Sequence, residues 1–146
     1  MSVYADTSFV ASLYMPDVHA ARATAIVTEL GVSLWINSLL EVELCNAIEL
    51  RVHRKWITLH AAQMAHNDFA EDIRKGVVTL HPLSHATFEE AKRLSRRHTA
   101  TLGTRSLDLM HVASAVTARA ATFLSFDRNQ RKLAEAAGLT LVPQVI

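Results

Sequence analysis

Short apolar runs alternate along the chain with longer stretches in which apolar residues recur every three or four positions. Short runs rich in β-branched and aromatic residues are typical of strands, whereas longer periodic stretches are typical of helices. We predict strands at about 3–5, 32–36, 77–80, 122–126 and 139–142. We predict helices at about 7–14, 19–30, 38–53, 58–75, 84–98, 105–120 and 128–137, with Pro16, Gly31, Gly76, Gly103 and Gly138 at the breaks between elements.

Strands that alternate with helices of this length predict a parallel sheet with helices on both faces. The strands are short and almost entirely apolar, as expected for strands that are covered on both sides. The sequence therefore predicts an α/β fold, a three-layer α/β/α domain with a mostly parallel five-stranded sheet. The chain length of 146 residues fits a single domain, 1–146.

The third predicted helix contains a capping pattern and the only cysteine of the chain. Ser38 and Glu41 have the spacing of a capping box, which predicts that the helix begins at Ser38 and assigns Glu41 a structural role. Cys45 lies within an apolar helical pattern and is expected in the core. A single thiol cannot form an internal disulfide bond, which favours a cytoplasmic protein.

Composition and charge narrow the classes further. The N-terminus lacks the pattern of a signal peptide, and no apolar run approaches the roughly 18 residues that cross a bilayer, so no membrane association is expected. The formal net charge is only +1, which neither indicates nor excludes nucleic-acid binding. Basic residues can gather on one face while acidic residues gather in a cleft.

Four acidic residues stand where the pattern favours an apolar group or a helix start: Asp6, Glu43, Asp108 and Asp127. Each also has a structural interpretation. Asp6 and Asp127 follow strands and precede helices, where a carboxylate caps free backbone N–H groups. Asp108 lies near a helix N-terminus, where the helix dipole favours an acid. Glu43 has mostly apolar neighbours one turn away and could be a satisfied polar residue at the edge of the core.

The predicted topology brings these four residues to one place. Asp6 and Asp127 both lie at the carboxyl ends of strands, and Glu43 is near the start of a helix that leaves such an end. The helix that carries Asp108 runs back toward the next strand, so it begins at the same edge of the sheet. Open α/β folds bind their ligands at this edge. Clustered carboxylates repel one another unless cations neutralise them, and oxygen ligands favour Mg²⁺ or Mn²⁺.

The segments around these acids are YADTS at 4–8, ELCNA at 43–47, RSLDLMHVASA at 105–115 and LSFD at 124–127. Taken in order, they resemble the four motifs of the PIN domain, and the overall pattern is closest to VapC-type toxins of bacterial toxin–antitoxin pairs. The resemblance covers the whole chain. It implies endonucleolytic cleavage of RNA, a homodimer and inhibition by an antitoxin protein.

The resemblance also implies roles for individual residues. The acidic residues of the family correspond to Asp6, Glu43, Asp108 and Asp127. The hydroxyl residue that follows the first acid in the family corresponds to Thr7 or Ser8. Many relatives have Thr two residues before the last acid, and here Ser125 keeps the hydroxyl. The family often has an aromatic residue three positions after the last acid, whereas this chain has Gln130 there. His111, three residues after Asp108, is interpreted as a core residue or as one that orients a ligand.

The resulting hypothesis is RNA cleavage by metal-activated water, with the four acids as metal ligands and Thr7, Ser8 and Ser125 orienting a water or a carboxylate. Basic residues near the site should offset repulsion between the acids and RNA. The candidates for RNA contact are Arg51, Arg54, Lys55, Arg105 and Arg128.

Three other classes of function are alternatives to this hypothesis. One is a catalytically silent module of the same fold that binds RNA or a partner helix. Another is a Mg²⁺ phosphohydrolase with a small-molecule substrate, which is disfavoured because the sequence has no Gly-rich phosphate loop. A receiver-type domain would need a second acid beside Asp6 and a Lys after a late strand, and the sequence has neither.

Overall fold

The computed structural model describes all residues 1–146 and contains five short strands, each followed or preceded by helices. The strands are β1 (Val3–Ala5), β2 (Leu34–Asn37), β3 (Val78–His81), β4 (Thr122–Leu124) and β5 (Thr140–Val142). The helices are α1 (Thr7–Tyr14), α2 (Ala20–Leu30), α3 (Ser38–His53), α4 (Leu59–Arg74), α5 (His85–Leu94), α6 (Ala100–Leu102), α7 (Ser106–Thr117) and α8 (Arg128–Ala136). A π-helical turn, Ser95–Thr99, joins α5 to α6.

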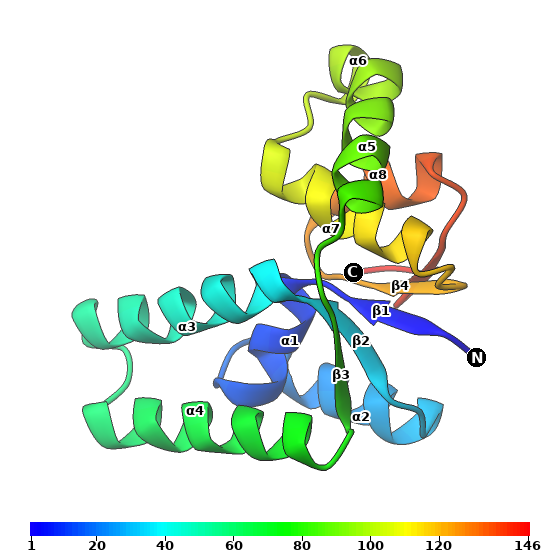
Figure 1. Cartoon of the computed structure of the whole chain (residues 1–146). Helices are drawn as coiled ribbons and strands as arrows, with labels where there is room; N and C mark the ends of the chain where they lie inside the picture. Colours follow the sequence, from blue (N-terminus) through cyan, green and yellow to red (C-terminus); the bar gives the residue numbers. More distant parts are fainter.

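All five strands are parallel and follow the order β3-β2-β1-β4-β5 (Figure 1). Strands β2 and β3 therefore lie on one side of β1, and β4 and β5 lie on the other side. Val3 of β1 is in register with Leu34 of β2 and with Thr122 of β4. The prediction of a parallel five-stranded α/β fold is confirmed.

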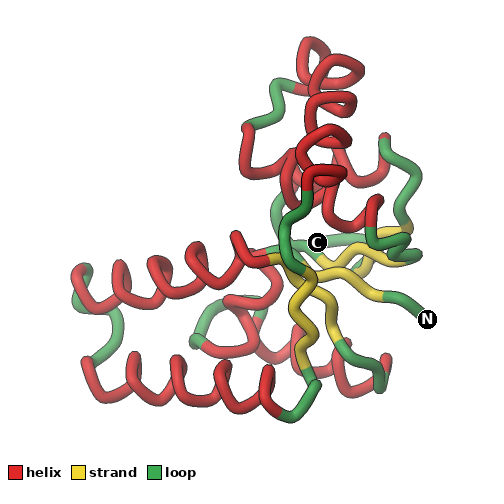
Figure 2. Tube along the Cα trace, viewed as in Figure 1, coloured by secondary structure: helices red, strands yellow, loops and turns green.

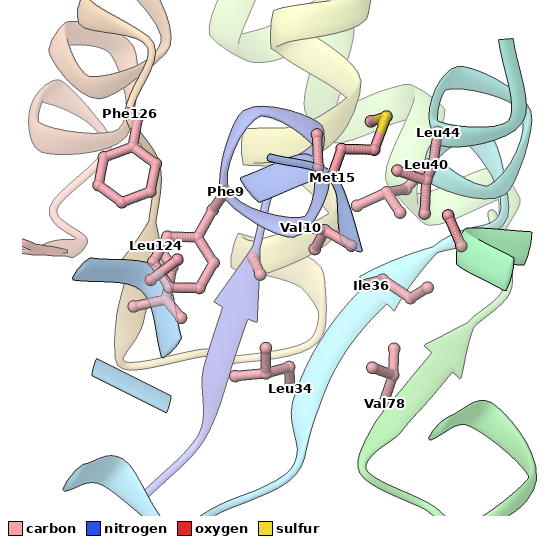
Figure 3. Packing of buried hydrophobic residues seen from close by; sticks show 14 of the residues in the cluster. Phe9, Val10, Met15, Leu34, Ile36, Leu40, Leu44, Val78, Leu124 and Phe126 are labelled. Carbon is pink, nitrogen blue, oxygen red and sulfur yellow. The ribbon is translucent and has the colours of Figure 1, made fainter. Parts of the chain in front are cut away.

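Helices cover both faces of the sheet, as the tube in Figure 2 shows. Alternate residues of β1 point to opposite faces, so Val3 and Ala5 belong to one apolar cluster and Tyr4 to the other. The first cluster unites the sheet with α1, α2, α3 and α4, and Figure 3 shows Phe9, Leu34 and Leu44 within it. The second cluster packs α5, α7 and α8 against the sheet. The three-layer arrangement follows directly from this alternation.

Two predictions about α3 are wrong. The helix is capped by Asn37, whose side chain accepts a hydrogen bond from the backbone N–H of Leu40, so Ser38 is the first helical residue and no capping box forms with Glu41. Cys45 is exposed. The residues of α3 that face the core are spaced by four, Leu40, Leu44 and Ile48, and Cys45 lies one position beyond that face.

The remaining differences concern element ends. The predicted helix at 84–98 ends as α5 at Leu94 and continues through the π-helical turn, and the chain reverses at Gly103, whose φ of 65° lies in the left-handed region. Strand β4 ends at Leu124, two residues earlier than predicted. None of the helices combines the length and apolar character required to span a bilayer.

Candidate active site

The candidate site lies at the carboxyl ends of β1 and β4. These two strands are neighbours, and the strand order of the sheet reverses between them. Asp6 follows β1 directly, and Asp127 lies three residues beyond the end of β4. The second turn of α3 supplies Glu43 and the first turn of α7 supplies Asp108 at the same edge. This is where open parallel sheets leave room for a ligand, because the helices depart to opposite faces.

Asp6 divides its two carboxylate oxygens between two roles. Its Oδ1 caps α1 by accepting the backbone N–H of Phe9 at 2.9 Å, and it also accepts the hydroxyl of Ser8 at 2.6 Å. Its Oδ2 is buried and has no hydrogen-bond partner. Burial raises the pKa of Asp6 and outweighs the hydrogen bonds that lower it. The capping interpretation is therefore correct for one oxygen and leaves the other free.

Asp127 also caps a helix with one of its carboxylate oxygens. Its Oδ1 caps α8 by accepting the backbone N–H of Gln130 at 2.8 Å. Its backbone N–H donates to Oγ of Ser125 at 3.0 Å, and that hydroxyl lies 3.4 Å from Oγ of Ser8. Ser8 in turn accepts the backbone N–H of Phe126 at 3.0 Å. Two of the predicted hydroxyls, on Ser8 and Ser125, thus tie the end of β4 to the start of α1.

Glu43 is held by the side chains of Thr7 and His111. The Thr7 hydroxyl donates to Oε2 of Glu43 at 2.5 Å, and Nε2 of His111 lies 3.1 and 3.2 Å from the two carboxylate oxygens. Burial raises the pKa of Glu43, but the contacts with His111 and Thr7 outweigh it and leave the pKa below its ordinary value. Glu43 is therefore kept ionised although its side chain is only 21% exposed.

Asp108 is buried in the first turn of α7, and Arg105 lies beside it. Nε of Arg105 is 3.3 Å from Oδ2 of Asp108, and its Nη2 is 4.0 Å from Oδ2 of Asp127. One guanidinium thus bridges two of the four predicted carboxylates. It supplies positive charge that lowers the repulsion between them.

These elements surround a cleft of about 410 Å³. It is lined by Thr7, Ser8, Glu43, Arg105, Ser106, Leu107, Asp108, Asp127 and Gln130. Three of the four predicted acids line the cleft, and Asp6 adjoins it because the next two residues, Thr7 and Ser8, both line it. All but one of the lining residues are polar or charged, which fits a charged or strongly polar ligand better than an apolar one.

The other basic residues predicted to contact RNA lie outside the cleft. Arg128 is exposed at the start of α8, directly after Asp127. Arg51 pairs with Asp17 near the opposite end of α3, and Arg54 and Lys55 follow that end. The end of α3 projects beyond the sheet in Figure 1. Only Arg105 among the five candidates is a lining residue.

Sequence reasoning missed three supporting residues. Gln130 is 5% exposed, lines the cleft, and has a buried Nε2 without a hydrogen-bond partner. Arg131 is buried and donates to the backbone carbonyls of Ser125, Pro143 and Gln144, which fastens the end of β4 to the C-terminal segment. The third residue, Tyr4, contacts His111. The motif spacing drew attention to His111, but nothing in the sequence linked His111 to Tyr4, which lies 107 positions away.

The donor set fits a divalent cation in its chemistry, although it is not arranged as a finished coordination shell. Four carboxylates and no thiolate adjoin the cleft, and the unpartnered, buried Oδ2 of Asp6 is the kind of oxygen that a hard cation satisfies. No three His, Cys, Asp or Glu side chains come together in a geometry that could hold a metal ion. The reason lies in the contacts above: Glu43 is held by Thr7 and His111, while Arg105 lies between Asp108 and Asp127.

Residues 3–136 match the family described as PIN domain, so the chain belongs to the PIN-domain family, as its motifs predicted. A search of curated proteins found no match.

Solved structures share the fold. The toxin VapC20 of Mycobacterium tuberculosis, described as cleaving the sarcin-ricin loop, is 21% identical with a TM-score of 0.70 over 95% of this chain and 97% of its own. FitAcB of Neisseria gonorrhoeae is 15% identical with a TM-score of 0.67 over 95% of each chain. VapBC2 of Rickettsia felis, solved with a DNA fragment from its promoter, is 16% identical with a TM-score of 0.66 over 97% of each chain.

Proposed function

We propose that this protein is a Mg²⁺- or Mn²⁺-dependent endoribonuclease that acts as the toxin of a toxin–antitoxin pair. The observation that carries the proposal is the buried, unpartnered Oδ2 of Asp6 beside a cleft lined by Glu43, Asp108 and Asp127. An ionised or hydrogen-bonding group that is buried without a partner costs free energy. Such groups are found mainly at functional sites, where a ligand can supply the missing contact.

In this proposal Asp6, Glu43, Asp108 and Asp127 hold the cation or cations. When bound, the cation would offset the charge of the scissile phosphate and activate a water for in-line attack. The chain's own contributions are geometric and electrostatic. Thr7 keeps Glu43 ionised and oriented. The hydroxyl of Ser8 orients Asp6, and that of Ser125 accepts the backbone N–H of Asp127. Arg105, 71% exposed in its side chain, can reach a phosphate that enters the cleft.

The biological part of the proposal is supported by similarity of fold and motif. Toxins and toxin–antitoxin assemblies, VapC20 and VapBC2, have the fold of this chain over almost its whole length. An antitoxin protein, a homodimer and a cytoplasmic location are accordingly proposed for this chain. Expression of the chain alone in a bacterial host should arrest growth, and co-expression of the cognate antitoxin should restore it.

The enzymatic part is tested by incubating the pure protein with structured RNAs in Mg²⁺, in Mn²⁺ and in EDTA. We expect cleavage that requires the divalent cation and is lost in Glu43→Gln and Asp108→Asn. Glu41→Gln is the matched control, since Glu41 lies in the first turn of α3, as Glu43 lies in the second, but does not line the cleft. Cleavage that continues in EDTA would disprove the metal-dependent mechanism.

The second candidate function is a silent PIN-fold module that binds RNA or a partner protein. It is favoured by the absence of three side chains arranged to hold a metal. Calorimetric titration separates the two: binding of Mg²⁺ or Mn²⁺ at millimolar concentration supports the nuclease, whereas RNA binding without metal binding supports the module.

A further inference from the structure

A buried chain of hydrogen bonds runs from the sheet to the candidate site. The hydroxyl of Tyr4, in the centre of β1, lies 2.9 Å from Nδ1 of His111 on α7. Nε2 on the other side of the imidazole lies 3.1 Å from Oε1 of Glu43 and 3.2 Å from Oγ1 of Thr7. Tyr4 is fully buried and His111 is 2% exposed. The mechanism proposed above uses neither of these two residues.

The contacts of Nε2 show that this nitrogen of the imidazole carries a proton. The carboxylate of Glu43 can only accept hydrogen bonds, and the hydroxyl proton of Thr7 is already directed at Oε2 of Glu43. Both neighbours of Nε2 therefore present lone pairs, so Nε2 must donate. In the neutral ring Nδ1 is then an acceptor, and the hydroxyl of Tyr4 is the donor that occupies it.

We infer that Tyr4 and His111 form a positioning relay that fixes the orientation of the Glu43 carboxylate. The phenol of Tyr4 holds the ring of His111 in the Nε2–H tautomer, and that N–H holds Glu43. Neither residue contacts the substrate or a cation in this arrangement. The inference rests on the proposed function for the role of Glu43, whereas the proton on Nε2 follows from the hydrogen bonds to Glu43 and Thr7.

The packing around the relay explains why it is rigid. Tyr4 stacks on Phe123 of β4, with ring centroids 5.6 Å apart and planes inclined by 14°, and meets the ring of His111 edge-on at 6.1 Å. A glutamate side chain has several rotatable bonds, so two donors on its carboxylate remove freedom that would otherwise be lost when a ligand binds. Groups that orient a ligand in this way commonly change metal affinity by about 10–100-fold.

The test combines a conservative series at each residue with a matched control. Tyr4→Phe removes the hydroxyl and keeps the stacked ring. His111→Leu removes both nitrogens, whereas His111→Gln can keep an N–H near the position of Nε2. Tyr14→Phe is the control, because the Tyr14 hydroxyl also donates a partly buried hydrogen bond, to Asp72 at 2.6 Å, away from the cleft.

Calorimetry with Mn²⁺ alone supplies the first readout. We expect Tyr4→Phe and His111→Leu to weaken Mn²⁺ binding by about 10-fold or more. His111→Gln should recover a large part of the affinity, and Tyr14→Phe should lose stability without losing affinity. If Tyr4→Phe and His111→Leu change the stability of the protein but bind Mn²⁺ as tightly as the wild type, the two residues have only a structural role and the inference is wrong.

The second readout does not depend on metal binding. Nitrogen-15 NMR of the imidazole in the wild type at neutral pH should show a protonated Nε2 and an unprotonated Nδ1, and Tyr4→Phe should change this pattern. An Nδ1–H tautomer, or an imidazolium protonated at both nitrogens, in the wild type would overturn the relay. A wild-type protein that shows the expected tautomer but binds no Mn²⁺ would disprove the proposed nuclease function and the metal-positioning role together, while retaining the hydrogen-bond assignment.

Discussion

Nε of Arg105 lies 3.3 Å from Oδ2 of Asp108, so a cationic side chain of the protein occupies a place beside the carboxylates that we propose as metal ligands. The same guanidinium reaches within 4.0 Å of Asp127. A divalent cation that binds Asp108 and Asp127 would compete with Arg105 for them. The guanidinium that it displaces is free to contact RNA.

This arrangement predicts opposite effects of one substitution on two ligands. Arg105→Gln should strengthen Mg²⁺ or Mn²⁺ binding by about fivefold, equivalent to roughly 1 kcal/mol for a largely exposed ion pair, because a competing charge is removed. The same variant should bind RNA more weakly. Arg128→Gln is the control, since Arg128 lies beside Asp127 without an ion pair to it, and should weaken RNA binding only. Calorimetry for the metal and RNA-binding titrations measure the two effects.

Asp6 predicts an unusual dependence of stability on pH. Burial raises its pKa in the folded protein, whereas the unfolded chain should ionise near about 3.9. Between these two values the folded state binds more protons than the unfolded state, so the contribution of Asp6 to stability falls as the pH rises. Asp6→Asn keeps an oxygen for the cap and removes the charge. We expect it to raise Tm at pH 7, by about 3 °C for each kcal/mol regained.

Thermal denaturation at several pH values checks this prediction. The gain in Tm should disappear below about pH 3.5, where the carboxyl is neutral in both states. At pH 7, millimolar Mg²⁺ should raise Tm of the wild type but not of Asp6→Asn. A variant that is less stable than the wild type at neutral pH would contradict the assignment of an uncompensated charge to Asp6.

Thr7 should influence the pH dependence of activity. Its hydroxyl is one of the two groups that hold the pKa of Glu43 down against the effect of burial. Thr7→Val keeps the shape and removes this donor, so the pKa of Glu43 should rise and the acidic limb of the pH–rate profile should move to higher pH. Thr7→Ser keeps the hydroxyl and should retain the profile of the wild type. Equal profiles for Val and Ser at this position would show that the hydroxyl has no such role.

Arg131 should be important for stability rather than for RNA binding. Its guanidinium is buried and satisfies three backbone carbonyls, of Ser125, Pro143 and Gln144. Arg131→Met leaves these carbonyls without donors and should lower the free energy of unfolding by about 2–4 kcal/mol. Lys132→Met, at the next and exposed position, should change it by less than about 0.5 kcal/mol. Urea denaturation of both variants decides the point.

The order of the elements and the edge of the sheet that carries the site could be predicted from local patterns. An Asp between an apolar run and a helix, as at Asp6 and Asp127, has a defined place once the strands are known to be parallel. The location of Glu43 and Asp108 at the same edge followed from the directions of the helices that carry them. The same local logic failed at the start of α3, because Asn37 and Ser38 are both good capping residues and only the end of β2 decides between them.

The contacts that give the site its properties could not be predicted in this way. Local sequence determines backbone torsions and which face of an element is apolar, and these are interactions between near neighbours. The link from Tyr4 to His111 spans 107 positions, and the contact between Thr7 and Glu43 spans 36. Such contacts depend on strand order and on how α3 and α7 pack against β1. By itself, the sequence determined four candidate carboxylates and their edge of the sheet, and the tertiary structure decided what each of their oxygens contacts.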